Sequence, residues 1–334
     1  MSKRIEWIDT AKGLGLLLVI IGHLKTPFLA SWIYTFHMPL FFILSGFVFS
    51  SDKYTFREFF KKRVNTLVIP YFCLGMVIFL WYSGIYYFQD RPAVEYGIML
   101  KDFLVQKHYW TIWFLAALFL TEIIYFGIDY LCKGRLLVST IVSSIVAFCG
   151  FIWYRLGGEG IAWNLDVAVI AQFFFHIGYC LRRNMFVTNY VVDGNYLRRV
   201  CIILALLVLN VSLGKLCIIL SGESLDMSIG MYGNEICTIL SAIAGSLSIL
   251  GLCSMIHNRF LNWLGKNTMV VFSWHSRIGI VGLGFLYQYY NLFVETTIAC
   301  RLQYTFISLF ILLALFIPIT LIIKKTPYHR FFGV

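Results

Sequence analysis

Charged residues are scarce in this sequence. Asp, Glu, Lys and Arg together make up 13% of the 334 residues, whereas hydrophobic residues make up 60%, and the mean hydropathy is +0.81. A soluble domain of this length has no means of keeping so much apolar surface away from water. The scarcity of charge therefore excludes a soluble protein and predicts a polytopic membrane protein.

Paired cysteines are missing as well. The nine Cys are scattered singly through apolar runs, and none stands in a C-x-x-C pair or at a Cys/His spacing typical of metal ligands. We interpret them as small apolar residues and expect neither a disulfide framework nor a metal site. No A-x-A-like cleavage site follows the first apolar run, so we expect no cleaved signal peptide. No internal repeat is visible.

Long apolar runs are the main feature that is present. About 20 apolar residues cross a bilayer as a helix, and by that rule the chain has about ten spans. Since no hydrophilic gap is longer than about 20 residues, we predict an all-α membrane helix bundle. Residues 1–334 are expected to form one domain without an appended soluble domain. The predicted spans are 8–24, 32–50, 64–88, 110–131, 136–154, 166–181, 200–221, 235–256, 268–290 and 302–323.

Basic residues gather in alternate loops. The net charge is +11, but its residues lie in short loops between spans, so we expect no nucleic-acid partner. With the N-terminus inside, eighteen Lys and Arg lie on the cytoplasmic side and six on the outer side, which is the positive-inside asymmetry. Both termini are therefore predicted to be cytoplasmic. The segment 51–63 mixes aromatic and basic residues and predicts an amphipathic helix at the cytoplasmic interface.

The first predicted span carries ionisable residues. Lys12 and His23 are eleven residues apart, about 20° from three full turns, so both project from one helix face, roughly 16 Å apart along the axis. Asp9 lies one turn before Lys12 and is placed to pair with it. Such a helix presents a cation at the cytoplasmic mouth of a cavity and an imidazole deep inside it. Alternatively, Lys12 snorkels to the headgroups and His23 caps the outer end of the span.

The second predicted span contains a histidine beside a proline. His37 precedes Pro39 by two residues, and proline disfavours helix before it but starts a helix well. We therefore expect His37 at a break, where irregular backbone lines a cavity. The alternative is a plain proline kink with His37 facing outer-leaflet water. Ser45 and Gly46 favour close helix packing over chemistry.

Further ionisable residues fall inside later spans. Glu122 lies near the middle of the fourth span, and His275 and Arg277 lie inside the ninth. Such groups are functional candidates by default, although Glu122 is also suited to pairing with a buried cation. His176 is better interpreted as a satisfied core histidine. This set of residues fits proton-transfer chemistry or a proton-coupled carrier, and it names no substrate.

Six motifs in order resemble the acyltransferase 3 family of integral-membrane acyltransferases, and especially its fucose 4-O-acetylase-like branch. The family's first span carries Arg or Lys, ten residues and then His, matched here by Lys12 and His23. Its second span is matched by "FHMPLFF..SGF" from Phe36 to Phe47, and the following loop by "KKRVNTLVIPYF" with Arg63 and Pro70. Later landmarks are matched by "YWTIWFLAALF", "FFFHIGYCLRR" and "LGKNTMVVFSWH".

The resemblance implies transfer of an acyl group, usually acetyl from acetyl-CoA. The acceptor is expected to be a hydroxyl of a cell-surface glycan or its lipid-linked precursor, at the bacterial cytoplasmic membrane and without a metal. Cytosolic acyl-CoA would place its phosphates against Lys12, Lys62 and Arg63, with Asp9 beside them. His23 would then be the general base or a transient acyl carrier.

Other residues receive supporting roles from the same resemblance. His37, Glu122 and His275 would orient His23 or bind the sugar, with Glu122 the favoured orienter. Arg277, or a backbone N–H at the break before Pro39, would stabilise the thioester oxyanion. Trp113 and Ser45 are further candidates for the oxyanion or acceptor site, and the outer segments 89–109 and 155–165 for acceptor recognition.

The sequence departs from the family pattern in two places. Lys12 replaces the commoner Arg, so bidentate phosphate recognition is lost, and "RVNT" follows where many members carry another basic residue. A transporter of a small solute or lipid-linked sugar is the main alternative, and an inert partner in a glycan-assembly complex is a weaker one. A homo-oligomer is also compatible with the sequence.

Overall fold

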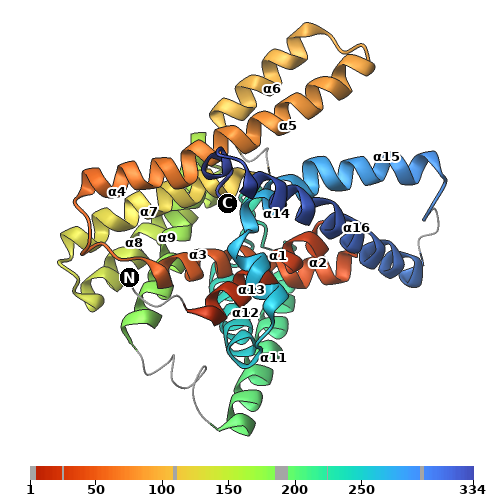
Figure 1. The fold of residues 1–334 in the computed structure, drawn as a ribbon. Helices are drawn as coiled ribbons and strands as arrows, with labels where there is room; N and C mark the ends of the chain where they lie inside the picture. The colour runs from red at the N-terminus through yellow and green to blue at the C-terminus, as the bar shows by residue number, and fades with distance from the viewer. Residues whose placement is uncertain (1–4, 25, 108–110, 185–194, 224, 294–296) are drawn as a thin grey trace.

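Helices dominate the computed structural model, which describes residues 5–24, 26–107, 111–184, 195–223, 225–293 and 297–334 (Figure 1). The first half contains α1 (Glu6–Gly22), α2 (Pro27–Tyr34), α3 (His37–Val48), α4 (Phe56–Arg63), η1 (Val64–Val68), α5 (Ile69–Phe88), α6 (Ala93–Val105), α7 (Trp113–Leu131) and α8 (Leu136–Arg155). The second half contains η2 (Ala162–Asn164), α9 (Leu165–Arg183), α11 (Tyr196–Ser221), η3 (Met227–Ile229), α12 (Glu235–Met255), α13 (Arg259–Lys266), α14 (Thr268–Trp274), η4 (His275–Ile280), α15 (Val281–Tyr289), α16 (Ile298–Lys325) and η5 (His329–Phe332).

The membrane-spanning pattern follows the apolar runs. Among the described residues, nine helical segments are long and apolar enough to cross a membrane. They correspond to the second through tenth predicted spans. The first predicted span is α1, which has 17 residues and is slightly shorter. The prediction of a polytopic membrane helix bundle is confirmed.

The second predicted span is interrupted, as the His37–Pro39 spacing predicts. α2 ends at Tyr34 and α3 begins at His37, so Pro39 stands in the first turn of the new helix, where its missing N–H costs no hydrogen bond. A buried amide holds the break in place: Trp32 Nε1 donates to Asn210 Oδ1 over 2.8 Å, and Asn210 Nδ2 donates to Thr35 Oγ1 over 2.9 Å.

The amphipathic segment predicted for residues 51–63 begins later and does not stand alone. α4 begins at Phe56 because Thr55 and Glu58 form a reciprocal capping box, which satisfies the first free N–H groups of the helix. The π-helix η1 then joins α4 to α5 without a break. Phe59 is buried, whereas Phe56 and Phe60 remain exposed, and the position of this segment at the cytoplasmic interface stays a prediction.

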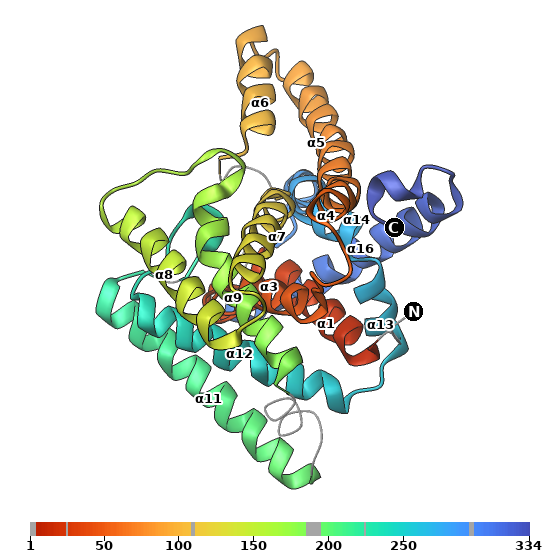
Figure 2. The ribbon, with the colours of Figure 1, turned by 90° about the vertical axis from the view of Figure 1, so that its left-hand side faces the viewer.

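Helix α1 lies in the interior of the bundle (Figure 2). It packs against α2, α3, α12, α13 and α14. Glycines bring its backbone very close to α13: a Cβ added at Gly265 would lie 1.7 Å from the Asp9 carbonyl oxygen. Asp9 itself is 3% exposed. The interior position of α1 means that its polar residues face protein rather than lipid.

A helical hairpin extends away from the rest of the bundle. α5 and α6 form this hairpin, which projects in both views (Figures 1 and 2). α6 was not predicted as a helix. Its C-terminal end is fixed to the bundle because Tyr71 donates to the Phe103 carbonyl over 2.5 Å and Trp163 Nε1 donates to the Leu104 carbonyl over 3.2 Å.

Candidate active site

Three histidines from three different elements line one cavity. His23 follows the last turn of α1, His37 begins α3 and His275 begins η4. The ring centroids of His23 and His275 are 5.1 Å apart, and Tyr34 stacks on His37 at 4.9 Å. His37 and His275 are buried, whereas His23 is exposed because its ring faces the open cavity.

The three imidazoles form the same kind of hydrogen bond with the backbone. Each Nδ1 lies within hydrogen-bond distance of a carbonyl of its own chain segment: Val19 for His23 (2.8 Å), Ile33 for His37 (3.0 Å) and Phe272 for His275 (2.7 Å). A carbonyl only accepts, so each Nδ1 carries the proton. In the neutral ring, Nε2 is then left as a proton acceptor, and His275 Nε2 has no hydrogen-bond partner among the described residues.

A loop between α11 and α12 contributes a carboxylate to the same cavity. Asp226 and Ser228 line it with the histidines, and Asp226 Oδ1 accepts from the Ser228 backbone N–H over 2.9 Å and its hydroxyl over 2.5 Å. Asp226 thus lies on the same cavity wall as His23. A nearby anion stabilises an imidazolium, so Asp226 is suited to support proton uptake by His23.

Sequence reasoning missed Asp226, because the loop "SGESLDMSIGMYGNE" showed only that it is acidic. The structure folds this loop inward on buried Leu225, Met227 and Tyr232. Burial raises the pKa of the Tyr232 hydroxyl well above its usual value, so this anchor stays uncharged. The Asp-x-Ser hydrogen-bonded turn within the loop was the available signal.

A second polar cluster surrounds Glu122 of α7. Its carboxylate, 4% exposed, forms an ion pair with Arg63 at the junction of α4 and η1. Lys62 and Lys12 also act electrostatically on Glu122. The three basic residues assigned to acyl-CoA phosphates therefore gather around one buried carboxylate, and we call these four residues the basic cluster.

The role expected of Glu122 as the orienter of His23 requires correction. Glu122 pairs with Arg63, and the described contacts of His23 are with Val19, Tyr34 and His275. Trp113 is the residue of α7 that lines the histidine cavity, and Glu122 lies more than two helical turns further along α7. Glu122 is therefore too far along the helix to contact His23. The carboxylate that faces His23 is Asp226.

The remaining predicted residues lie at several places. Lys62 Nζ donates to the Tyr54 hydroxyl over 2.8 Å, and this bond lowers the pKa of Tyr54. Ser45 donates to the Phe41 carbonyl over 2.8 Å, so its hydroxyl serves its own helix. Next to it, Gly46 allows the close packing that was predicted, since an added Cβ would lie 1.8 Å from the Phe175 carbonyl oxygen.

The interpretation of His176 has a clear outcome, whereas acceptor recognition by the outer segment 89–109 stays a prediction. His176 contacts Tyr125 and Thr140, each over 2.8 Å, which confirms that it is a satisfied core histidine. Of the outer segment 89–109, residues 108 and 109 lie outside the described residues. No group of three or more His, Cys, Asp or Glu in the described part of the chain is arranged to hold a metal ion.

Arg277 faces away from His275. Its guanidinium lies 6.0 Å from the ring centroid of Tyr82 on α5, while His275 faces the cavity with His23. Residues two apart on a helix project to different sides. The π-helix η4 therefore separates the histidine cavity from a second cleft beside α5 and α6.

The membrane helix bundle agrees with a comparison to known protein families. Residues 5–325 match a family described as an acyltransferase domain. The chain belongs to the acyltransferase 3 family. It is therefore an acyltransferase with multiple membrane-spanning helices, and the resemblance found in its motifs is confirmed.

One curated relative shares part of the sequence. The chain is 27% identical over 154 residues to nodulation protein NolL of Sinorhizobium fredii (strain NBRC 101917 / NGR234), a match that covers 41% of this chain and 41% of that protein. The chain therefore aligns with less than half the length of this relative. No solved structure matches the chain significantly.

Proposed function

We propose that this acyltransferase transfers an acetyl group from cytosolic acetyl-CoA to a hydroxyl of a cell-surface glycan or its lipid-linked precursor, in the bacterial cytoplasmic membrane. The observation that carries the proposal is the histidine cavity, in which neutral imidazoles from α1, α3 and η4 present Nε2 acceptors beside the carboxylate of Asp226. Proton removal from a hydroxyl requires such an acceptor.

The basic cluster supports the donor side of the reaction. Lys12, Lys62 and Arg63 supply positive charge for the phosphates of acetyl-CoA, and Glu122 holds the Arg63 guanidinium in place. Lys12 and His23 lie on one helix, roughly 16 Å apart along its axis. The pantetheine arm would extend along α1 and bring the thioester to His23.

His23 is the preferred general base because it shares a cavity with Asp226, whose carboxylate would stabilise an imidazolium. His23 Nε2 takes the proton of the acceptor hydroxyl as the hydroxyl oxygen attacks the thioester carbonyl carbon. When the carbon–sulfur bond breaks, the CoA thiolate leaves and takes that proton from the imidazolium. The acetyl ester of the acceptor and free CoA are the products.

The shared tautomer limits what His37 and His275 do in this scheme. Since Nδ1 carries the proton in each ring, a neutral His37 or His275 has no N–H to offer an oxyanion from Nε2. These rings instead accept hydrogen bonds from acceptor hydroxyls. Because Arg277 lines the other cleft, the remaining candidate for oxyanion stabilisation is a backbone N–H at the break before Pro39.

The test is thermal stability of the detergent-purified protein with acetyl-CoA, CoA and desulfo-CoA. A ligand that binds only the folded state raises the melting temperature by mass action. Acetyl-CoA should stabilise the wild type and His23→Ala, and Lys12→Ala should lose the effect. If no CoA species at millimolar concentration shifts the well-folded wild type, the donor assignment is wrong and transport assays follow, since a transporter has no need of a CoA-phosphate site.

A further inference from the structure

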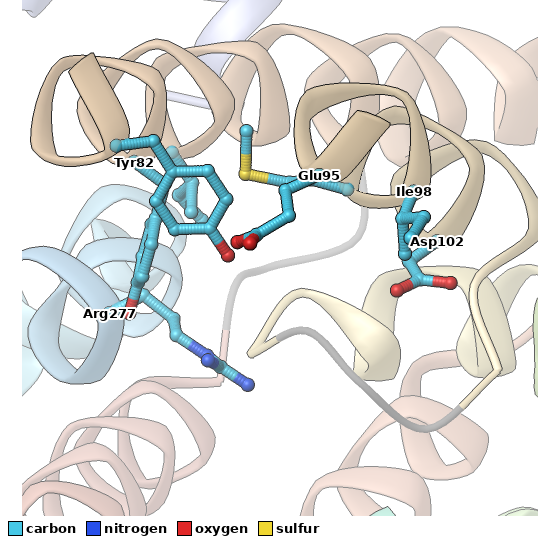
Figure 3. A pocket seen from close by; sticks show the side chains of 8 residues that line it. Tyr82, Glu95, Ile98, Asp102 and Arg277 are labelled. Atoms are coloured by element: carbon cyan, nitrogen blue, oxygen red, sulfur yellow. The ribbon is translucent and has the colours of Figure 1, made fainter. Parts of the chain in front are cut away.

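A cleft separate from the histidine cavity lies between the α5–α6 hairpin and η4 (Figure 3). Its volume is about 270 Å³, slightly below the size of pockets that hold drug-sized ligands. Such a space accommodates roughly one six-membered ring with its substituents. The cleft is lined by Ile78, Tyr82, Tyr86, Glu95, Ile98, Met99, Asp102 and Arg277.

The helix α6 turns a polar stripe toward this cleft. Glu95, Ile98 and Asp102 stand at helix positions i, i+3 and i+7, which share one face. Tyr82 and Tyr86 of α5 stand one turn apart and face them. Figure 3 shows both carboxylates and the guanidinium of Arg277 directed into the same space.

The cleft is lined by two carboxylates and one guanidinium. Glu95 also approaches Arg91 at 3.6 Å, but these side chains are 31% and 50% exposed, and such surface pairs bind weakly. Arg277 lies over the ring of Tyr82 at 6.0 Å. The cleft therefore offers two carboxylate acceptors, one guanidinium and two aromatic rings, with an excess of one negative charge.

The position of the cleft links it to the reaction. His275 and Arg277 occupy one six-residue π-helix, and π-helical turns are frequent at functional sites. One side of this helix borders the histidine cavity and the other borders the cleft. A ligand in the cleft would therefore lie across η4 from a substrate in the cavity.

We propose that this cleft is an acceptor subsite, which binds a neutral pyranose ring of the glycan next to the sugar that is acylated. The proposal rests on the function proposed above. The carboxylates of Glu95 and Asp102 accept hydrogen bonds from ring hydroxyls, and Arg277 donates to ring or glycosidic oxygens. Tyr82 and Tyr86 cover the apolar C–H face of the ring.

The lining disfavours other ligand classes. A uronic acid or a sugar phosphate would bring negative charge against two carboxylates, which is repulsive. An acyl chain would bury the same carboxylates without hydrogen-bond partners, which is costly. A neutral sugar ring can donate hydrogen bonds to the carboxylates and, at the same time, place its C–H face against the tyrosine rings.

The experiment measures glycoside binding to the full chain in detergent by saturation-transfer NMR and calorimetry. The probes are methyl glycosides of neutral hexoses, deoxyhexoses and N-acetylhexosamines, with methyl glucuronide and glucose 1-phosphate as anionic comparisons. The variants are Glu95→Gln, Asp102→Asn and Tyr82→Leu. Asp90→Asn is the matched control, because Asp90 is exposed at the α5–α6 turn, outside the cleft, with φ of 50°, a conformation that Asn tolerates.

We expect at least one neutral glycoside to bind the wild type and Asp90→Asn equally. Asp102→Asn and Glu95→Gln should weaken this binding about tenfold each, since hydrogen bonds to charged groups are the stronger ones. Acetyl-CoA should raise the melting temperature of these variants as it does that of the wild type, which separates a failure of the subsite from a failure of the donor site. Preference for an anionic glycoside, equal binding by all variants, or no glycoside binding by a wild type that binds acetyl-CoA would each overturn the proposal.

Discussion

The histidines of the cavity differ mainly in what surrounds Nε2. His23 is exposed and shares its cavity with Asp226, whereas His37 and His275 are buried. The difference assigns proton transfer to His23 and acceptor binding to the other two rings. Asparagine and glutamine therefore make informative replacements, since Asn reproduces the Nδ1 donor and Gln reproduces the position of Nε2.

Replacing Asp226 should impair the chemical step alone. Asp226→Asn keeps the side chain's shape and an oxygen for the Ser228 hydrogen bond, but it removes the charge that stabilises a protonated His23. We expect kcat for acetyl transfer to fall about 100-fold, the lower range of general acid–base effects, while acetyl-CoA still raises the melting temperature. Steady-state kinetics with membrane-derived acceptor and a thermal-shift titration measure the two effects. Loss of the acetyl-CoA shift in this variant would place Asp226 in the donor site instead.

Replacing Glu122 should instead lower the stability of the protein and weaken its binding of acetyl-CoA. Glu122→Gln leaves Arg63 without its buried partner, and removing one member of a buried ion pair costs about 3–5 kcal/mol. Arg63 is 19% exposed, so the cost falls at the lower end of that range. We expect a lower melting temperature and a weaker acetyl-CoA response, with Asp129→Asn as a comparison because Asp129 is a buried carboxylate of the same helix that accepts from Tyr179 instead. An unchanged acetyl-CoA affinity would separate Glu122 from donor binding.

At the scale of elements, Gly46 of α3 and Gly178 of α9 set the distance between these two helices. An added Cβ at Gly178 would lie 1.9 Å from the Ile43 carbonyl oxygen, whereas nothing lies within 4 Å of one at Gly127 of α7. Gly178→Ala must push two helix backbones apart, and overpacking of this kind costs about 1–3 kcal/mol or more. Gly127→Ala should instead stabilise by up to about 1 kcal/mol through helix propensity. Melting temperatures in detergent should therefore move in opposite directions, and a fall for both would show that α3–α9 packing is not the cause.

The elements also show where sequence reasoning succeeded and where it failed. Apolar runs fixed the spans within a few residues, and the His37–Pro39 spacing located the break between α2 and α3, because both depend on local chemistry. The inward fold of Asp226 depends on burial of Tyr232 and Leu225, and the partner of Glu122 depends on how α4 meets α7. Such contacts join distant segments, so a single sequence does not display them.

At the scale of the whole molecule, the distribution of Lys and Arg predicts a single orientation. Glu159, in the exposed connection between α8 and α9, should face outward, and Lys133, in the turn after α7, should face the cytoplasm. Glu159→Cys should react with a membrane-impermeant maleimide in intact cells, and Lys133→Cys only after permeabilisation. The wild type, labelled in parallel, accounts for its nine cysteines. The reverse labelling pattern would invert the orientation and with it the side from which acetyl-CoA is drawn.

The interior position of α1 has a consequence for how the protein is made. α1 is synthesised long before its neighbours α12, α13 and α14, which lie more than 200 residues further along the chain. His275 follows His23 by 252 residues, which at about 5–20 residues per second corresponds to roughly 13–50 seconds of synthesis. Throughout that interval α1 carries Asp9, Lys12 and His23 into the membrane without the helices that later enclose them. The nascent chain therefore depends on the insertion machinery or on early neighbours such as α2 and α3 to shelter these residues until α12, α13 and α14 have been synthesised.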